Sequence, residues 1–215
     1  MIEEIISRST LYSEALSDGI ANLTEMARRI QPEVEKRRME KVAIETIAVA
    51  LKRLQAKIEA PESSTNYLKK LENLTVRSGL VEFYFKTPEQ SISLNEAIYG
   101  KAKKYTNQFV TISHGYTYTA VIVGKMLEKD VAQVLKEKNV KGVTKIPDLG
   151  SITIRLPEEH IFVAGVDYPI LGLLAWHNIN IIELISTASE FSMFFEDKDV
   201  DRAFSIIKSL PSRIT

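Results

Sequence analysis

The chain has 215 residues, 45% of them hydrophobic, so it can bury a sizeable core and form one large domain or two to three small ones. It has no cysteine, which excludes disulfides, thiol catalysis and thiolate zinc sites and agrees with a cytoplasmic location. The 28 lysine and arginine residues balance the 28 aspartate and glutamate residues, which argues against a broadly basic nucleic-acid binder. This balance is compatible with one basic module on a larger neutral body. No apolar window reaches the roughly 18 residues of a membrane span, and residues 1–4 lack signal-peptide features, so we expect no membrane partner.

Residues 1–60 are predicted to form a small all-α domain. An amphipathic pattern begins at Ile2 and breaks near Gly19. Asn22, followed three residues later by Glu25, is typical of a helix N-terminus, and the helix that it opens is predicted to end at Pro32. A further helix is indicated by apolar residues at helical spacing, namely Ile44, Ile47, Ala48, Leu51, Leu54 and Ile58.

Two helices of this domain, at 23–30 and 43–54, resemble the helix-turn-helix of small prokaryotic regulators. In that arrangement the second helix lies in the major groove and basic residues lie near phosphates. The DNA-binding residues predicted on this basis are Arg28, Arg29, Thr46, Lys52 and Arg53. Val49 and Ala50 on the outward face cannot read base edges by hydrogen bonding, so a plain helical dimerisation or docking domain remains the alternative.

Residues 61–73 are predicted to be a linker, because 61–66 is polar and begins with a helix-breaking proline. Beyond it the hydrophobic period becomes strand-like, and residues 74–156 are predicted to form a first β-α-β-β-α-β unit. The elements expected there are one or two strands within 74–85, a helix at 92–105, strands at 109–113 and 116–123, a helix at 126–138 and extended structure at 143–156.

Residues 157–215 are predicted to form a second unit of the same kind. An alternating strand with Ile161 and Val163 is expected before Asp167, and Pro169 suits the first turn of a helix that ends near Asn178. Strands at 182–185 and 191–195 and a helix at 197–210 follow. No fourth strand is obvious after this helix.

Three stretches of the second unit together resemble the ACT domain, and most closely the regulatory ACT repeats of aspartokinases. They are Tyr168-Pro169-Ile170, Asn178-Ile179-Asn180-Ile181 and Ile185-Ser186-Thr187-Ala188-Ser189-Glu190. The extra Ala188 and the lack of glycine after Pro169 depart from the aspartokinase pattern. The resemblance implies an α+β fold of tandem ferredoxin-like βαββαβ (ACT) units behind the small all-α domain. It also implies strands exchanged between units, so that residues 150–166 could supply strands to both sheets. It further implies a homodimer formed through the ACT-like domains and a free amino acid as effector.

A zwitterionic amino acid needs acceptors for its ammonium and donors for its carboxylate. The helix that Pro169 opens offers N–H groups to a carboxylate, Asn178 can donate and accept, and backbone near Ile181 could bind the ammonium. The predicted ligand-binding residues are Asp167, Tyr168, Pro169, Ile170, Asn178, Asn180, Ile181, Ser186 and Thr187. A simpler interpretation remains open, in which Asp167 is a helix N-cap and the asparagines are turn residues. The first unit has residues 89–91 in the equivalent turn, and we expect it to serve as scaffold and dimer contact.

Catalytic motifs are missing from the sequence. It has no Walker loop, dinucleotide fingerprint or Gly-x-Ser-x-Gly motif, and no histidine pair at ligand spacing, so we expect no enzyme activity, metal or cofactor. The leading hypothesis is an amino-acid-responsive transcriptional regulator. The alternative is a freestanding allosteric regulatory subunit of an amino-acid biosynthetic enzyme, without DNA binding.

Overall fold

The computed structural model describes residues 1–58, 73–89, 91–106 and 108–210, and the chain divides into two compact units, Met1–Glu62 and Ser63–Thr215. The stretch 61–66, on which the linker prediction rests, lies outside the described residues. Among the helices that are described, none is long and apolar enough to cross a membrane.

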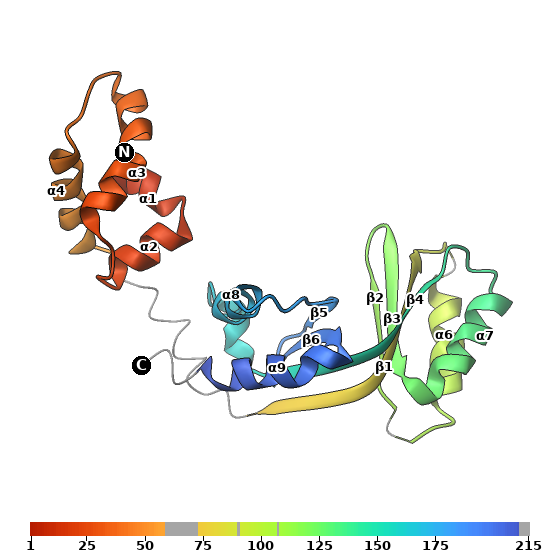
Figure 1. The fold of residues 1–215 in the computed structure, drawn as a ribbon. Coiled ribbons are helices and arrows are strands. Elements are labelled where there is room, and N and C mark those ends of the chain that lie inside the picture. Colours follow the sequence, from red (N-terminus) through yellow and green to blue (C-terminus); the bar gives the residue numbers. More distant parts are fainter. Residues whose placement is uncertain (59–72, 90, 107, 211–215) are drawn as a thin grey trace. The chain divides into compact units, whose positions relative to one another are not determined.

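The N-terminal unit contains four described helices around one apolar core (Figure 1). Their bounds are α1 Ile2–Ser7, α2 Thr10–Ser17, α3 Leu23–Arg38 and α4 Ile44–Gln55. The helix start predicted at Asn22 is confirmed, since its side-chain oxygen accepts hydrogen bonds from the N–H groups of Thr24 (3.1 Å) and Glu25 (3.2 Å). The apolar spacing of α4 explains its burial, because Ile47, Leu51 and Leu54 face the core.

The predicted helix end at Pro32 is wrong, because α3 continues through Pro32 to Arg38. Proline removes one N–H from the helix, but Val34, two residues further on, is buried in the core of the unit and holds this half of the helix in place. The turn after α3 is also fixed to it. Gln31 donates from its side-chain amide to the carbonyl of Val42 (2.9 Å), and the Val42 N–H donates to the carboxylate of Glu35 (3.1 Å).

The second unit is built on one six-stranded antiparallel sheet with the strand order β2-β3-β1-β4-β6-β5. The strands are β1 Leu74–Lys86, β2 Val110–His114, β3 Tyr118–Gly124, β4 Thr144–Arg155, β5 Glu183–Ser186 and β6 Glu190–Glu196. The helical segments are α6 Ser91–Ala102, η1 Lys125–Leu127, α7 Glu128–Glu137, η2 Glu158–Phe162, α8 Tyr168–Trp176 and α9 Asp197–Lys208.

Two βαββαβ halves share the long strands β1 and β4, which run through both (Figure 1). The later part of β1 pairs with residues 144–149 of β4 in the half that carries α6 and α7, while the beginning of β1 pairs with residues 151–154 in the half that carries α8 and α9. The second half therefore takes its fourth strand from β1, which explains why α9 needs no strand after it.

Two bulges twist this shared ribbon. The register of β1 against β4 shifts between Arg77 and Leu80 and again between Leu80 and Glu82. Gly79 in β1 has φ +66° and Asp148 in β4 has φ +52°, as expected where extra residues leave the ladder. The sheet faces opposite the helices then meet in a small core of Leu80, Ile122, Leu149 and Phe194.

The predicted strand containing Ile161 and Val163 is wrong, and residues 150–166 supply only β4. Residues 158–162 form the 3-10 segment η2, after Pro157. The imidazole Nδ1 of His160 lies 2.9 Å from the Pro157 carbonyl, and the His160 N–H donates to the same carbonyl (3.0 Å). Two alternating apolar residues are too few to outweigh this local turn, and Ile161 is 54% exposed.

Candidate functional site

A cavity of about 340 Å³ lies at the start of α8. Its lining consists of His160, Ile161, Val163, Gly165, Val166, Asp167, Tyr168 and Ser186. The cavity therefore brings together three of the nine predicted ligand-binding residues, Asp167, Tyr168 and Ser186, from the turn before α8 and the end of β5.

Asp167 is the most distinctive group in this cavity, which we call the Asp167 pocket. Its main-chain carbonyl accepts the first helical hydrogen bond from the Leu171 N–H (3.0 Å), but its side chain caps none of the helix N–H groups. The Asp167 Oδ1 atom is buried and has no hydrogen-bond partner among the described residues. Asp167 is therefore the N-cap residue of α8, as the simpler interpretation predicted, but it caps the helix through its main-chain carbonyl and not through its side chain. A buried oxygen without a partner costs about 1–3 kcal/mol, so an ammonium donor would be favoured there.

Other predicted ligand residues near the pocket have structural contacts. Ile170 is 1% exposed and packs in the core beneath α8 and α9, and Pro169 occupies the first turn of α8. Thr187 closes the β5–β6 turn, because its N–H donates to the Glu190 carbonyl (2.8 Å) and its hydroxyl accepts from the Glu190 N–H (3.2 Å). Exposed Ser186 and half-exposed Tyr168 are the side chains best placed to contact a ligand beside Asp167.

Asn178 lies just beyond the opposite end of α8, about 16 Å along the helix axis from Asp167. It has φ +54°, and its N–H donates to the Ala175 carbonyl while the Ile179 N–H donates to the Leu174 carbonyl (both 3.0 Å). These two bonds form a Schellman motif, in which a left-handed residue ends the helix. Asn178 therefore has a clear structural role, and Asn180 and Ile181, which follow it, do not line the Asp167 pocket.

The end of α7 repeats this arrangement. Asn139 has φ +58°, its N–H donates to the Lys136 carbonyl and the Val140 N–H donates to the Leu135 carbonyl (both 3.0 Å). Because both halves use asparagine in the same way, the asparagine at Asn178 is explained by helix termination alone.

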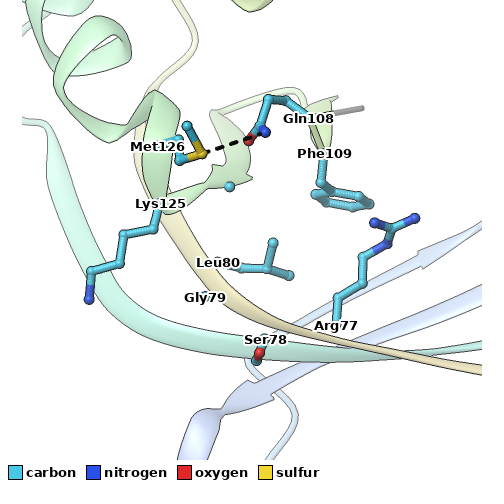
Figure 2. Close-up of a pocket in the computed structure, with 9 residues that line it drawn as sticks. Arg77, Ser78, Gly79, Leu80, Gln108, Phe109, Lys125 and Met126 are labelled. Carbon is cyan, nitrogen blue, oxygen red and sulfur yellow. Dashed lines mark hydrogen bonds between the residues drawn. The ribbon is translucent and has the colours of Figure 1, made fainter. Parts of the chain in front are cut away.

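A second cavity, of about 280 Å³, lies beside the β1 bulge (Figure 2). The Arg77 guanidinium lies over the Phe109 ring, 5.4 Å from its centroid, and Lys125 points away from them toward Asp148, which it contacts at 3.0 Å. None of the predicted ligand-binding residues lines this cavity, and both of its described cations have a partner, Arg77 on the Phe109 ring and Lys125 on Asp148.

The predicted DNA-binding residues lie on the surface of the N-terminal unit. Thr46, Lys52 and Arg53 are exposed on α4, and Arg28 and Arg29 are exposed on α3, where Arg28 pairs with Glu25 (2.5 Å). The connection at 39–43 is longer than the roughly three to four residues of a helix-turn-helix. DNA binding therefore stays a prediction.

No protein-family model and no curated protein sequence matches the chain. Among solved structures, aspartate kinase from Clostridium acetobutylicum, described as an allosteric enzyme, matches 66% of the chain with a TM-score of 0.56 and 13% identity. The match covers only 34% of that enzyme. A structure of aspartokinase alpha and beta subunits (TM-score 0.53, 15% identity) matches 65% of the chain and 97% of its own length.

The ligand-free regulatory subunit of aspartate kinase from Thermus thermophilus (TM-score 0.52, 14% identity) matches 64% of the chain and is itself covered to 97%. These matches show fold and not descent, because all identities are low. The predicted fold class is confirmed: the chain is α+β, with a helical segment followed by a β-rich region that has the ACT-type fold of aspartokinase regulatory subunits.

Proposed function

We propose that the protein is an amino-acid-responsive regulatory subunit. A free amino acid binds in the Asp167 pocket, and its occupancy is transmitted to an amino-acid biosynthetic enzyme that docks on the N-terminal helical unit. The observation that carries this proposal is the buried Asp167 Oδ1, which has no hydrogen-bond partner among the described residues and lies in a pocket of an ACT-type fold.

The pocket offers complementary groups to the two charged ends of an amino acid. The Asp167 carboxylate is an acceptor for the ammonium group, and a charge-assisted hydrogen bond there would satisfy its buried oxygen. The first turn of α8 and the hydroxyl of Ser186 offer donors to the carboxylate, with the helix dipole oriented favourably. Regulation further requires that the effector bind one state of the protein more tightly than another.

A thermal-shift screen of the twenty amino acids on the full chain tests this function. An effector at 100 times its dissociation constant should stabilise the protein by about 2.7 kcal/mol. Asp167→Asn should abolish the shift, whereas Asn139→Gly, at the end of α7, should leave it unchanged. A flat screen, or a shift that survives in Asp167→Asn, would contradict the proposal.

DNA is the second candidate partner of the N-terminal unit. It is favoured by one observation, the exposed row of Thr46, Lys52 and Arg53 on α4. A mobility-shift assay against the genomic region around its own gene, at low salt and with a pool of amino acids, separates the two candidates. Retention that is lost in the Lys52→Glu, Arg53→Glu double variant supports a transcriptional regulator, and absence of retention leaves the enzyme-docking subunit.

A homodimer through the second unit is part of the same proposal. The sheet has two edge strands, β2 and β5, and unpaired edges favour association with a second copy. Light scattering after size exclusion should give twice the mass of one chain, and a monomer at all concentrations would contradict this.

A further inference from the structure

A third cavity, of about 380 Å³, lies between the two halves of the second unit. The first half contributes Glu82, Tyr84, Ser113 and Tyr118, and the second half contributes Ile182 and Glu183. We call it the Glu82 cleft. It shares no lining residue with the Asp167 pocket.

Glu82 is unusual in its position. It stands in the middle of β1, between Val81 and Phe83, which point the other way into the core beneath α6 and α7. Glu82 is only 3% exposed, and its Oε2 atom is buried without a hydrogen-bond partner among the described residues. Neither Glu82 nor Glu183 forms an ion pair with any described residue. Two carboxylates thus line one cleft, which is unfavourable for their ionised forms unless a ligand supplies a cation.

The chemistry of the walls selects the ligand class. The rings of Tyr84 and Tyr118 meet edge to face, with centroids 6.3 Å apart, and aromatic walls attract cations. Ile146 and Ile182 offer apolar surface to an alkyl chain. Among the described residues, no lysine or arginine lines the cleft, so none of them offers a cation to a ligand carboxylate there. A metal ion fits less well, because no cluster of three or more potential metal ligands occurs in the described part of the chain.

We propose that the Glu82 cleft is a second ligand site, which binds the primary ammonium group of a small aliphatic amine between the carboxylates of Glu82 and Glu183. The ammonium supplies three donors, enough to satisfy the orphaned oxygen of Glu82 and to reach Glu183. Because residues of both halves line the cleft, the bound amine holds the two halves together.

Isothermal titration of the full chain with n-butylamine and 1,4-diaminobutane, at pH 8 and constant ionic strength, tests the proposal. n-Butanol and butyrate are matched neutral and anionic probes. We expect the amines to bind and the two other probes not to bind. Glu82→Gln and Glu183→Gln should each lower amine affinity tenfold or more, whereas Glu14→Gln, at an exposed acid of α2 that lines neither pocket, should leave it unchanged.

The pH dependence gives a second readout. The titratable groups that line the cleft are Glu82, Glu183, Tyr84 and Tyr118, and His114 lies at its border, 2.9 Å from the Thr119 hydroxyl. Since burial and Glu183 raise the pKa of Glu82 to about 7, the ionised carboxylate becomes about tenfold more populated from pH 6 to pH 8. Amine affinity should rise by about the same factor, and this rise should disappear in Glu82→Gln.

Three results would overturn the proposal: no amine binding, equal binding to Glu82→Gln, or equal heat from sodium or magnesium chloride at the same ionic strength. The proposed function fails separately, because it depends on the amino-acid screen and on Asp167→Asn.

Discussion

Glu183 on β5 lies close enough to Glu82 on β1 for its charge to raise the pKa of Glu82. Burial of Glu82 is the larger cause, and together the two effects raise its pKa from the ordinary 4.5 to about 7. The strands β4 and β6 separate β1 from β5 in the sheet order. The two residues lie close together because the helix-free faces of the two halves meet, as the small core around Leu80 and Phe194 shows.

Glu82 should make the protein less stable as the pH rises. The pKa of Glu82 is higher in the folded state than in the unfolded state. The contribution of Glu82 to the free energy of unfolding is therefore fully present below about pH 4.5 and is lost as the pH rises through 7. A shift of this size corresponds to about 3 kcal/mol. Urea denaturation of the protein and of Glu82→Gln at pH 5, 6, 7 and 8 should show a difference that grows with pH, in favour of the variant. Parallel pH profiles would contradict the expected titration of Glu82.

Gly150→Ala should destabilise the second unit. A Cβ at Gly150 would lie 2.6 Å from the Val200 Cγ2 atom and 2.9 Å from the Arg77 carbonyl oxygen, so either α9 or β1 must shift. Overpacking of this kind costs about 1–3 kcal/mol. Gly172→Ala is the matched control, because a Cβ there meets nothing within 4 Å and alanine favours the helix by up to about 1 kcal/mol. Chemical denaturation measures the free energy of unfolding of both variants. If Gly150→Ala is as stable as the unaltered protein, α9 is not packed tightly on β4.

Periodicity predicted most of the second unit, since α6, α7, α9 and the strands lie close to their expected ranges. Periodicity failed where a local turn determines the backbone conformation. The alternation of Ile161 and Val163 predicted a strand, but Ile161 lies in the 3-10 segment η2. It failed again at Pro32, where tertiary packing outweighs a helix-breaking residue. Asp167, Asn178 and Ser186 were predicted to bind one ligand, and the structure places Asp167 and Ser186 in one pocket but Asn178 at the other end of α8. A sequence resemblance does not report the positions of side chains.

Glu82 was missed, although one signal for it was present. A single acid within the apolar run of residues 80–85 is unusual for a buried strand, and the strand alternation alone would place it opposite Val81 and Phe83. The sequence does not show which residues lie beside Glu82. Ile182 and Glu183 come from the other half of the unit, and the bulges near Gly79 and Asp148 set how the two halves lie against each other.

Met39→Gly should stabilise the N-terminal unit. Met39 ends α3 in the left-handed region, with φ +56°, and is 90% exposed, so it gains little from packing. Glycine removes the strain of this conformation, and we expect a gain of about 1 kcal/mol in the free energy of unfolding. Met39→Ala is the control, because it removes the exposed side chain but keeps the strain. If both variants gain equally by urea denaturation, the backbone conformation is not the cause.

Asn178 separates a structural role from a ligand-binding one. Its left-handed conformation ends α8, and the Arg202 guanidinium of α9 donates to the adjacent carbonyl of His177, which fixes this turn. Asn178→Ala should therefore cost about 1 kcal/mol, as should Asn139→Ala at the end of α7, whereas Asn178→Gly should be close to neutral.

The effector found in the amino-acid screen should stabilise Asn178→Gly as much as the unaltered protein, because Asn178 lies at the other end of α8 from the Asp167 pocket. Thermal shifts with and without effector measure this directly. Loss of the thermal shift in Asn178→Gly but not in Asn139→Gly would mean that Asn178 contacts the effector. It would also require the effector to contact the C-terminal end of α8, which the Asp167 pocket does not reach.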